Sequence, residues 1–316
     1  MWCVRTMGRS GLHTALIAVA IVAAAARASA QACCAGAAAV TPGRLAIHED
    51  ALVGLQLKTA NVFGSFSTDG SYASAPPSTT EWEFEQDLFG ALRVLPRGQL
   101  ALLVPVIETY RRTPNRSSFG GGLGDINFGA RYDFVLAGEA RYIPGIAVLA
   151  GVTFPTGESI ESAEDPLGTD ATGVGTYQAN VGLAIEQSEG PWLFGVTGLV
   201  AKRASRTVDT GVGPVTTSLA ARWTLLASTA YTFPNDAAVA VLASYAVEGS
   251  PEVTPEVIGP PLATRRLPLF GLVGLHPITD AWRLQGGFFL TPPISSFGRA
   301  TTAQLEFVLA LLRSWS

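Results

Sequence analysis

Apolar and polar residues alternate along most of the chain beyond residue 50. In residues 176–186, Tyr177, Val181 and Ile185 are apolar, whereas the positions next to them are mostly polar or small. A period of two is that of a strand with one apolar face and one wet face. The pattern recurs twelve times and predicts strands over 51–66, 81–95, 99–111, 123–136, 140–155, 174–187, 191–203, 216–233, 237–248, 265–277, 280–291 and 299–312.

The connections between these segments alternate in length. Connections after even-numbered segments are tight and rich in turn formers, as at 96–98 and 234–236. Connections after odd-numbered segments are mostly long, and 292–298 is the shortest of them. This alternation predicts an all-β fold, a closed transmembrane antiparallel up-and-down barrel of about twelve strands and outer-membrane type. Tight turns and both termini would lie in the periplasm of a Gram-negative bacterium.

Within each predicted strand the bulky apolar residues share one face, which would contact lipid. In strand 123–136, Phe128, Tyr132 and Phe134 alternate with polar or small residues. Charged residues of the opposite parity would then point into the lumen and select solutes. The candidate channel-lining residues are Glu83, Glu85, Asp87, Arg93, Arg131, Asp133, Arg222 and Arg283.

Aromatic residues of the apolar parity fall near the strand ends and predict two interfacial girdles. The set toward the tight turns includes Trp192 and Trp282, and the set toward the long loops includes Trp82 and Phe154. The last strand alternates apolar residues and ends near Trp315, which resembles the signal read by the barrel-insertion machinery. Expected partners are therefore outer-membrane lipid and lipopolysaccharide, this machinery and a small-molecule solute.

The first thirty residues read as a cleaved signal peptide, with a basic start, an apolar core of about a dozen residues and an A-x-A site. Residues 31–50 would form a flexible periplasmic segment, and residues 51–316 the barrel. Cys33 and Cys34 fall in this segment. A vicinal disulfide, a link to a partner, acylation of Cys33 and no role at all stay open as alternatives.

Composition narrows the function. The chain is 48% hydrophobic and 15% charged, has 34 glycines and carries a net charge of −4. A protein that binds nucleic acid would show a basic footprint, so this class is excluded. The composition suits a barrel that shows one face to lipid.

Motifs for catalysis and metal binding fail on context. A lipid-modifying barrel would need a histidine near an outward serine, but His48 precedes the first strand and His276 lies at a tight turn. The ladder Glu83, Glu85 and Asp87 could serve as an acid/base pair, yet balance by the lumen arginines is the better interpretation. The acidic loop 156–173 does not fit a calcium-loop spacing. We predict no enzyme activity, no cofactor and no metal.

Three glycine-rich stretches resemble a known family. Residues 122–132 (GLGDINFGARY), 151–158 (GVTFPTGE) and 173–175 (GVG) look like the MetA-pathway phenol-degradation family of outer-membrane transporters. The resemblance is close over about 119–200 and implies uptake of aromatic or other poorly polar small molecules. It implies no particular ligand residues.

The sequence thus predicts a narrow outer-membrane channel or facilitated-diffusion protein, since twelve strands enclose less space than the 16-stranded porins. One alternative is a structural or surface-display barrel that does not transport. Its lumen would be plugged by paired charges and by the segment 31–47. Glycines in the strands are expected where side chains from neighbouring strands must fit inside the barrel.

Overall fold

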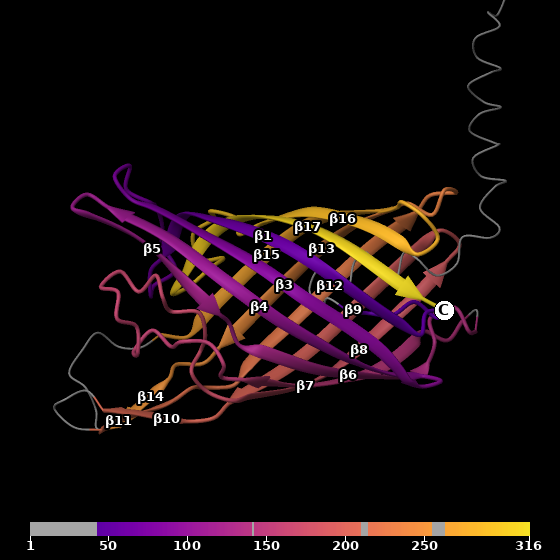
Figure 1. The fold of residues 1–316 in the computed structure, drawn as a ribbon, viewed down its shortest axis with the longest axis horizontal. Coiled ribbons are helices and arrows are strands. Elements are labelled where there is room, and N and C mark those ends of the chain that lie inside the picture. Colours follow the sequence, from indigo (N-terminus) through magenta and orange to yellow (C-terminus); the bar gives the residue numbers. More distant parts are fainter. Residues whose placement is uncertain (1–42, 141, 210–213, 255–262) are drawn as a thin grey trace, which may run out of the picture.

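The computed structural model describes residues 43–140, 142–209, 214–254 and 263–316 (Figure 1). The expected signal peptide, Cys33 and Cys34 lie outside the described residues. Within these ranges no helix is long and apolar enough to cross a membrane.

A closed antiparallel barrel of twelve strands forms the body of the molecule, which confirms the predicted fold class. Each strand pairs with the next along the chain, and the last strand pairs with the first from Ala51–Trp315 to Phe66–Thr301. Closure leaves no sheet edge exposed to lipid. The barrel strands are β1 (Ala51–Phe66), β3 (Thr80–Leu95), β4 (Gly98–Thr113), β6 (Ile126–Val135), β7 (Gly145–Phe154), β8 (Gln178–Glu189), β9 (Trp192–Arg203), β12 (Arg222–Thr232), β13 (Ala238–Glu248), β15 (Arg265–Pro277), β16 (Trp282–Leu290) and β17 (Thr301–Trp315).

Five short strands lie at the long-loop end of the barrel. The sequence pattern did not predict them as separate elements. β2 (Tyr72–Ser74) pairs with β1, and β5 (Arg116–Leu123) pairs with β4. β10 (Arg206–Asp209), β11 (Pro214–Ser218) and β14 (Glu252–Thr254) form a separate small sheet. In Figure 1 this sheet and β5 lie at the end opposite the C-terminus.

Several barrel strands begin later than the alternation predicted, and for β6, β7 and β12 the structure shows why. β6 starts at Ile126 rather than 123 because Asp125 leaves the ladder and accepts hydrogen bonds from the backbone N–H groups of Gly157 and Val174. β7 starts at Gly145, directly after Pro144, whose ring removes a ladder donor. β12 starts at Arg222, because 214–218 belong to the small outer sheet.

The outer surface carries the apolar parity. In β6, Phe128, Tyr132 and Phe134 are exposed while the residues between them are less so, apart from the small Ala130. Aromatic rings meet near both ends of the strands, as Trp192 does with Tyr231 at a centroid distance of 4.9 Å. The lipid-facing assignment of this parity follows.

Bulky side chains fill the lumen along β13, β15, β16 and β17. A buried cluster packs there, formed by Leu242, Val273, Phe289 and Val308 of these strands together with Leu226 of the neighbouring β12. The Phe289 ring lies over Gly271 of the adjacent strand, where an added Cβ would fall 2.5 Å from the ring. Here a glycine does make room for an inward aromatic residue, as expected from the sequence.

The N-terminal segment, residues 43–50, lies inside the barrel at the tight-turn end. Leu45 packs in a cluster with residues of β1, β3 and β17, whereas Ala46 packs in a cluster with residues of β9, β12, β13 and β15. Because adjacent residues of the segment contact different parts of the wall, the segment crosses the lumen. Part of the stretch that we expected to be flexible therefore has fixed contacts, since its apolar side chains find partners in the lumen.

Candidate functional site

A cavity of about 430 Å³ opens inside the barrel along β4, β6, β7, β8, β9 and β12. It follows a row of inward positions that pair directly from strand to strand, namely Ala101, Gly129, Gly151, Asn180 and Ala201. Four of these five residues have no side chain longer than a methyl group. The space exists because this wall carries so little side-chain volume.

The lining of the cavity combines leucines with polar side chains. Leu103, Leu149, Leu199 and Leu226 provide apolar surface. Gln99, Asn127, Gln178, Asn180, Thr197 and Thr224 add amides and hydroxyls, and Arg44, Arg131 and Arg222 add positive charge. A lining that combines apolar surface with polar groups that can orient a ligand suits a site for a small organic molecule.

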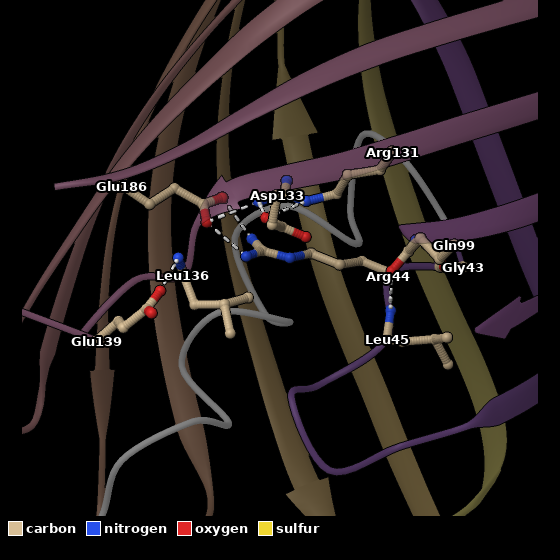
Figure 2. A network of polar contacts seen from close by, with 9 residues as sticks. All are labelled: Gly43, Arg44, Leu45, Gln99, Arg131, Asp133, Leu136, Glu139 and Glu186. Atoms are coloured by element: carbon tan, nitrogen blue, oxygen red, sulfur yellow. Dashed lines mark hydrogen bonds and ion pairs between the residues drawn. The ribbon is translucent and has the colours of Figure 1, made fainter. Parts of the chain in front are cut away.

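Arg44 of the N-terminal segment lines this cavity, and its side chain reaches toward Glu186 in Figure 2. Its guanidinium makes a bidentate ion pair with Glu186 of β8. Arg131 of β6 also reaches Glu186, at 3.0 Å, and bonds Asp133 at 2.7 Å. Two arginines thus meet two carboxylates, and bidentate pairing of this kind fixes geometry as well as charge.

Gln99 of β4 holds the backbone of the segment (Figure 2). Its side-chain oxygen accepts a hydrogen bond from the Leu45 N–H at 3.1 Å, and its amide group donates to the Gly43 carbonyl at 3.1 Å. Gly43 has φ +96°, a left-handed conformation that favours glycine. One side chain of the wall therefore satisfies both a donor and an acceptor of the segment.

Glu49 anchors the other end of the segment. Its carboxylate pairs with Arg283 of β16 at 2.6 Å and accepts the Ala46 N–H at 2.8 Å. Arg93 of β3 donates to the Glu49 carbonyl at 2.8 Å and to the Ala46 carbonyl. Because Glu49 is only 3% exposed, these partners take the place of the water that its carboxylate has lost.

The acidic ladder of β3 points into the lumen and runs from the middle of the strand toward the long-loop end. Asp87 is buried and accepts a hydrogen bond from Gln56 of β1 at 2.9 Å. Glu85 pairs with Lys58 of β1. Glu83 is half-buried next to them, two residues further toward the loops. Lys58 is thus the cation that this ladder shares.

The structure places all eight candidate channel-lining residues at lumen-facing positions but in separate groups. Arg131 and Arg222 line the cavity, and Asp133 supports Arg131. Arg93 and Arg283 hold the N-terminal segment instead of the acidic ladder. Among the described residues, the ladder therefore pairs with Lys58 and not with the arginines of distant strands. The reason is that β3 has β1 and β4 as neighbours and Lys58 lies on β1. A channel-lining role of the eight residues stays a prediction.

Sequence reasoning did not single out Arg44, Gln99, Glu186 and Lys58. Glu186, Gln99 and Lys58 do have the inward parity, so the alternation could have found them. Arg44 precedes the first strand, and no periodicity places it.

A long loop between β7 and β8 packs against β4 and β5 at the long-loop end of the barrel. Arg111 of β4 donates to the carbonyls of Leu167 and Gly168 at 2.7 and 3.1 Å. Asp165 accepts a hydrogen bond from the Ser118 hydroxyl at 2.6 Å, and this bond is the main reason that the pKa of Asp165 lies below its usual value. The Asp165 carboxylate thus binds β5 and its own loop. Among the described residues, no group of His, Cys, Asp or Glu is arranged to hold a metal ion.

No protein-family model matches the chain, and no curated protein matches it significantly. An outer membrane channel from Pseudomonas putida F1 has a TM-score of 0.68 at 12% identity, with 84% of this chain and 96% of that chain covered. The transport unit of the autotransporter AIDA-I from Escherichia coli has a TM-score of 0.48 at 10% identity, covering 84% and 90%. The Pseudomonas putida toluene transporter TodX has a TM-score of 0.44 at 9% identity, covering 89% and 94%.

At such identities the likeness to the first of these structures shows a shared fold. Together with the closed strand pairing, it defines the protein as an outer-membrane-type β-barrel. Its particular form has an open side of the lumen, a filled side and a segment of its own chain across the tight-turn end. The resemblance to the MetA-pathway family stays a prediction, because no family model supports it.

Proposed function

We propose that the protein is a narrow outer-membrane channel for small organic solutes. The observation that carries this proposal is the cavity along the small-residue wall, which has the volume of a small-molecule site and both apolar and polar lining. A barrel that served only as a scaffold would have no need of an uncrowded wall, because packed side chains stabilise it better.

The N-terminal segment supports a restricted passage rather than a wide pore. It is held by polar contacts at Arg44 and Glu49 and by two small apolar contacts, at Leu45 and Ala46. Such contacts can open and close without unfolding the barrel. Small solutes would pass beside the segment or on its displacement, and large ones would be excluded.

The solutes would be poorly polar, with aromatic compounds as the first class to test. Leucines and alanines provide apolar lining, and the glycine-rich stretches resemble a family linked to phenol degradation. Tight turns would face the periplasm, so the segment would close the periplasmic side.

The same segment also favours a second candidate, a structural barrel whose lumen is plugged. Swelling of proteoliposomes distinguishes the two. We expect protein purified from outer membranes to admit phenyl glucoside, a neutral aromatic solute that crosses lipid poorly, and to exclude the trisaccharide raffinose.

Folding is verified independently by the shift in gel mobility on heating. A folded barrel that admits neither solute would contradict the channel and support the plugged alternative. Equal entry of both solutes would contradict the restricted passage.

A further inference from the structure

The structure assigns the wall around Arg222 as a subsite for the carboxylate of a small amphipathic anion, and this inference rests on the proposed channel function. Arg222 is the first residue of β12, lines the 430 Å³ cavity and also lines a smaller pocket toward the long loops. Among the described residues its guanidinium has no hydrogen bond or ion pair.

Three arginines surround a single carboxylate at this place. Arg222 and Arg265 are the direct cross-strand partners of Glu248, one on each side of β13. The Glu248 carboxylate nevertheless bonds Arg203 of β9, at 2.8 Å. All four side chains line the smaller pocket, which leaves an excess of two positive charges there.

Gln178 adds a neutral donor next to this cluster. Its side-chain oxygen accepts a hydrogen bond from Arg203 Nε at 3.0 Å, so its amide nitrogen remains as a donor at the cavity. The Arg222 fork and this amide are donors that lack an acceptor among the described residues. The one carboxylate near Arg222 among the described residues, that of Glu248, is bonded to Arg203, so the half-buried Arg222 guanidinium is poorly compensated, and an anion in the cavity would supply the missing counter-charge.

The rest of the cavity selects the shape of the anion. Ala201 lies directly beside Arg222, and the leucines of the wall, such as Leu199 and Leu226, lie further from the loops. A planar carboxylate on Arg222 would therefore leave an apolar body against the leucines. Aromatic and short aliphatic acids have this form, whereas an inorganic anion would leave the apolar part unused.

The opposite side of the barrel would orient such a molecule. Glu83, Glu85 and Asp87 lie on β3, which the strand order places across the lumen from β12. These charges repel a carboxylate and favour its placement on the Arg222 wall. Recognition is thus expected from charge separation across the lumen as well as from the guanidinium itself.

Titration calorimetry of the full barrel in detergent, with benzoate and its neutral isostere benzamide, tests the subsite. We expect benzoate to bind more tightly than benzamide, and Arg222→Gln to weaken benzoate binding by about tenfold to a hundredfold, as for the loss of a charged hydrogen bond. Arg222→Lys, which keeps the charge without the fork, should retain part of the affinity. Arg112→Gln is the matched control, because Arg112 is exposed at the end of β4.

Unchanged benzoate binding in a folded Arg222→Gln variant, or equal binding of benzoate and benzamide, would overturn the subsite. If Arg222→Gln does not fold, Arg222→Lys decides instead. A ratio of benzoate to benzamide affinity equal to that of the unsubstituted protein would then overturn the subsite. Swelling in phenyl glucoside reports on the channel separately. Benzoate binding without any solute entry would contradict the channel and leave the subsite intact.

Discussion

The two sides of the lumen are built from different side chains. On the open side, one row of paired inward positions holds four small residues, Ala101, Gly129, Gly151 and Ala201, and a single longer one, Asn180 of β8. On the filled side, β13, β15, β16 and β17 place large apolar residues toward the axis, and Phe289 is 3% exposed. The backbone pairing is the same on both sides, so the cavity depends on side-chain size alone.

This difference separates stability from passage. Packed apolar side chains inside a barrel stabilise it, while a wall of glycine and alanine gives up that packing. The open side is bounded instead by polar contacts. Arg44 makes them at the tight-turn end, and the β7–β8 loop makes them with β4 and β5 at the long-loop end. Contacts of this kind respond to pH and to substitution without loss of the barrel.

Removal of Phe289 should have the largest effect on the barrel. Phe289→Ala leaves a hole over Gly271, and we expect the free energy of unfolding to fall by about 3–5 kcal/mol, as for other buried phenylalanines. Urea unfolding in micelles measures this. Phe288→Ala is the matched control, because Phe288 points to lipid and is 44% exposed. An equal loss in both variants would contradict the filled side as a packed core.

Filling the open side should instead stop passage and leave stability nearly unchanged. A Cβ on Gly129 would meet only Ala101, at 3.9 Å, so Gly129→Leu can place its side chain in the cavity. We expect phenyl glucoside entry to fall by about tenfold, because lining and diameter set the flux.

Gly198→Leu provides the matched control for this substitution. Gly198 pairs with the lipid-facing Leu225, and nothing lies within 4 Å of its added Cβ. Undiminished entry in a folded Gly129→Leu variant would show that solutes do not use the cavity.

Loss of Arg44 tests the contacts that hold the N-terminal segment at the tight-turn end of the open side. In Arg44→Gln, Glu186 keeps Arg131, so we expect a moderate destabilisation of about 1–3 kcal/mol. Ion conductance in planar bilayers should rise several-fold as the segment loosens. Arg97→Gln breaks the exposed pair with Glu139, which solvent screens, and should leave both the stability and the conductance nearly unchanged. Equal conductance in both variants would show that Arg44 does not restrict the passage.

The sequence predicted the strands and the inward parity but could not predict this division of the lumen. Alternation identifies which face of β16 is inward, and therefore that Phe289 and Arg283 share it. It does not reveal which inward residues meet, because contacts across the lumen depend on strand stagger. Arg44 lies outside every periodic segment, and its partner Glu186 follows it by 142 residues. Likewise, the acidic ladder pairs with Lys58 rather than with distant arginines because adjacent strands decide the contact.

Acid should weaken the attachment of the β7–β8 loop and leave the filled side of the lumen unchanged. The pKa of Asp165 is lowered chiefly by the Ser118 hydroxyl, so the ionised form stabilises the loop. This contribution is complete above the unfolded value of about 3.9 and is lost as pH falls through the lowered pKa. Pepsin cleavage of the β7–β8 loop should therefore be slow at pH 4 and rise at lower pH.

Ser118→Ala removes the main cause of the shift and should move the onset of cleavage to higher pH. Ser117→Ala is the matched control, because Ser117 is exposed on the same strand, β5. Equal onsets in the two variants would show that the Ser118 to Asp165 bond does not hold the loop. If cleavage of Ser118→Ala began at a lower pH than that of the unsubstituted protein, the direction of the pKa shift would be contradicted. Loss of a donor to the carboxylate can only raise the pKa of Asp165.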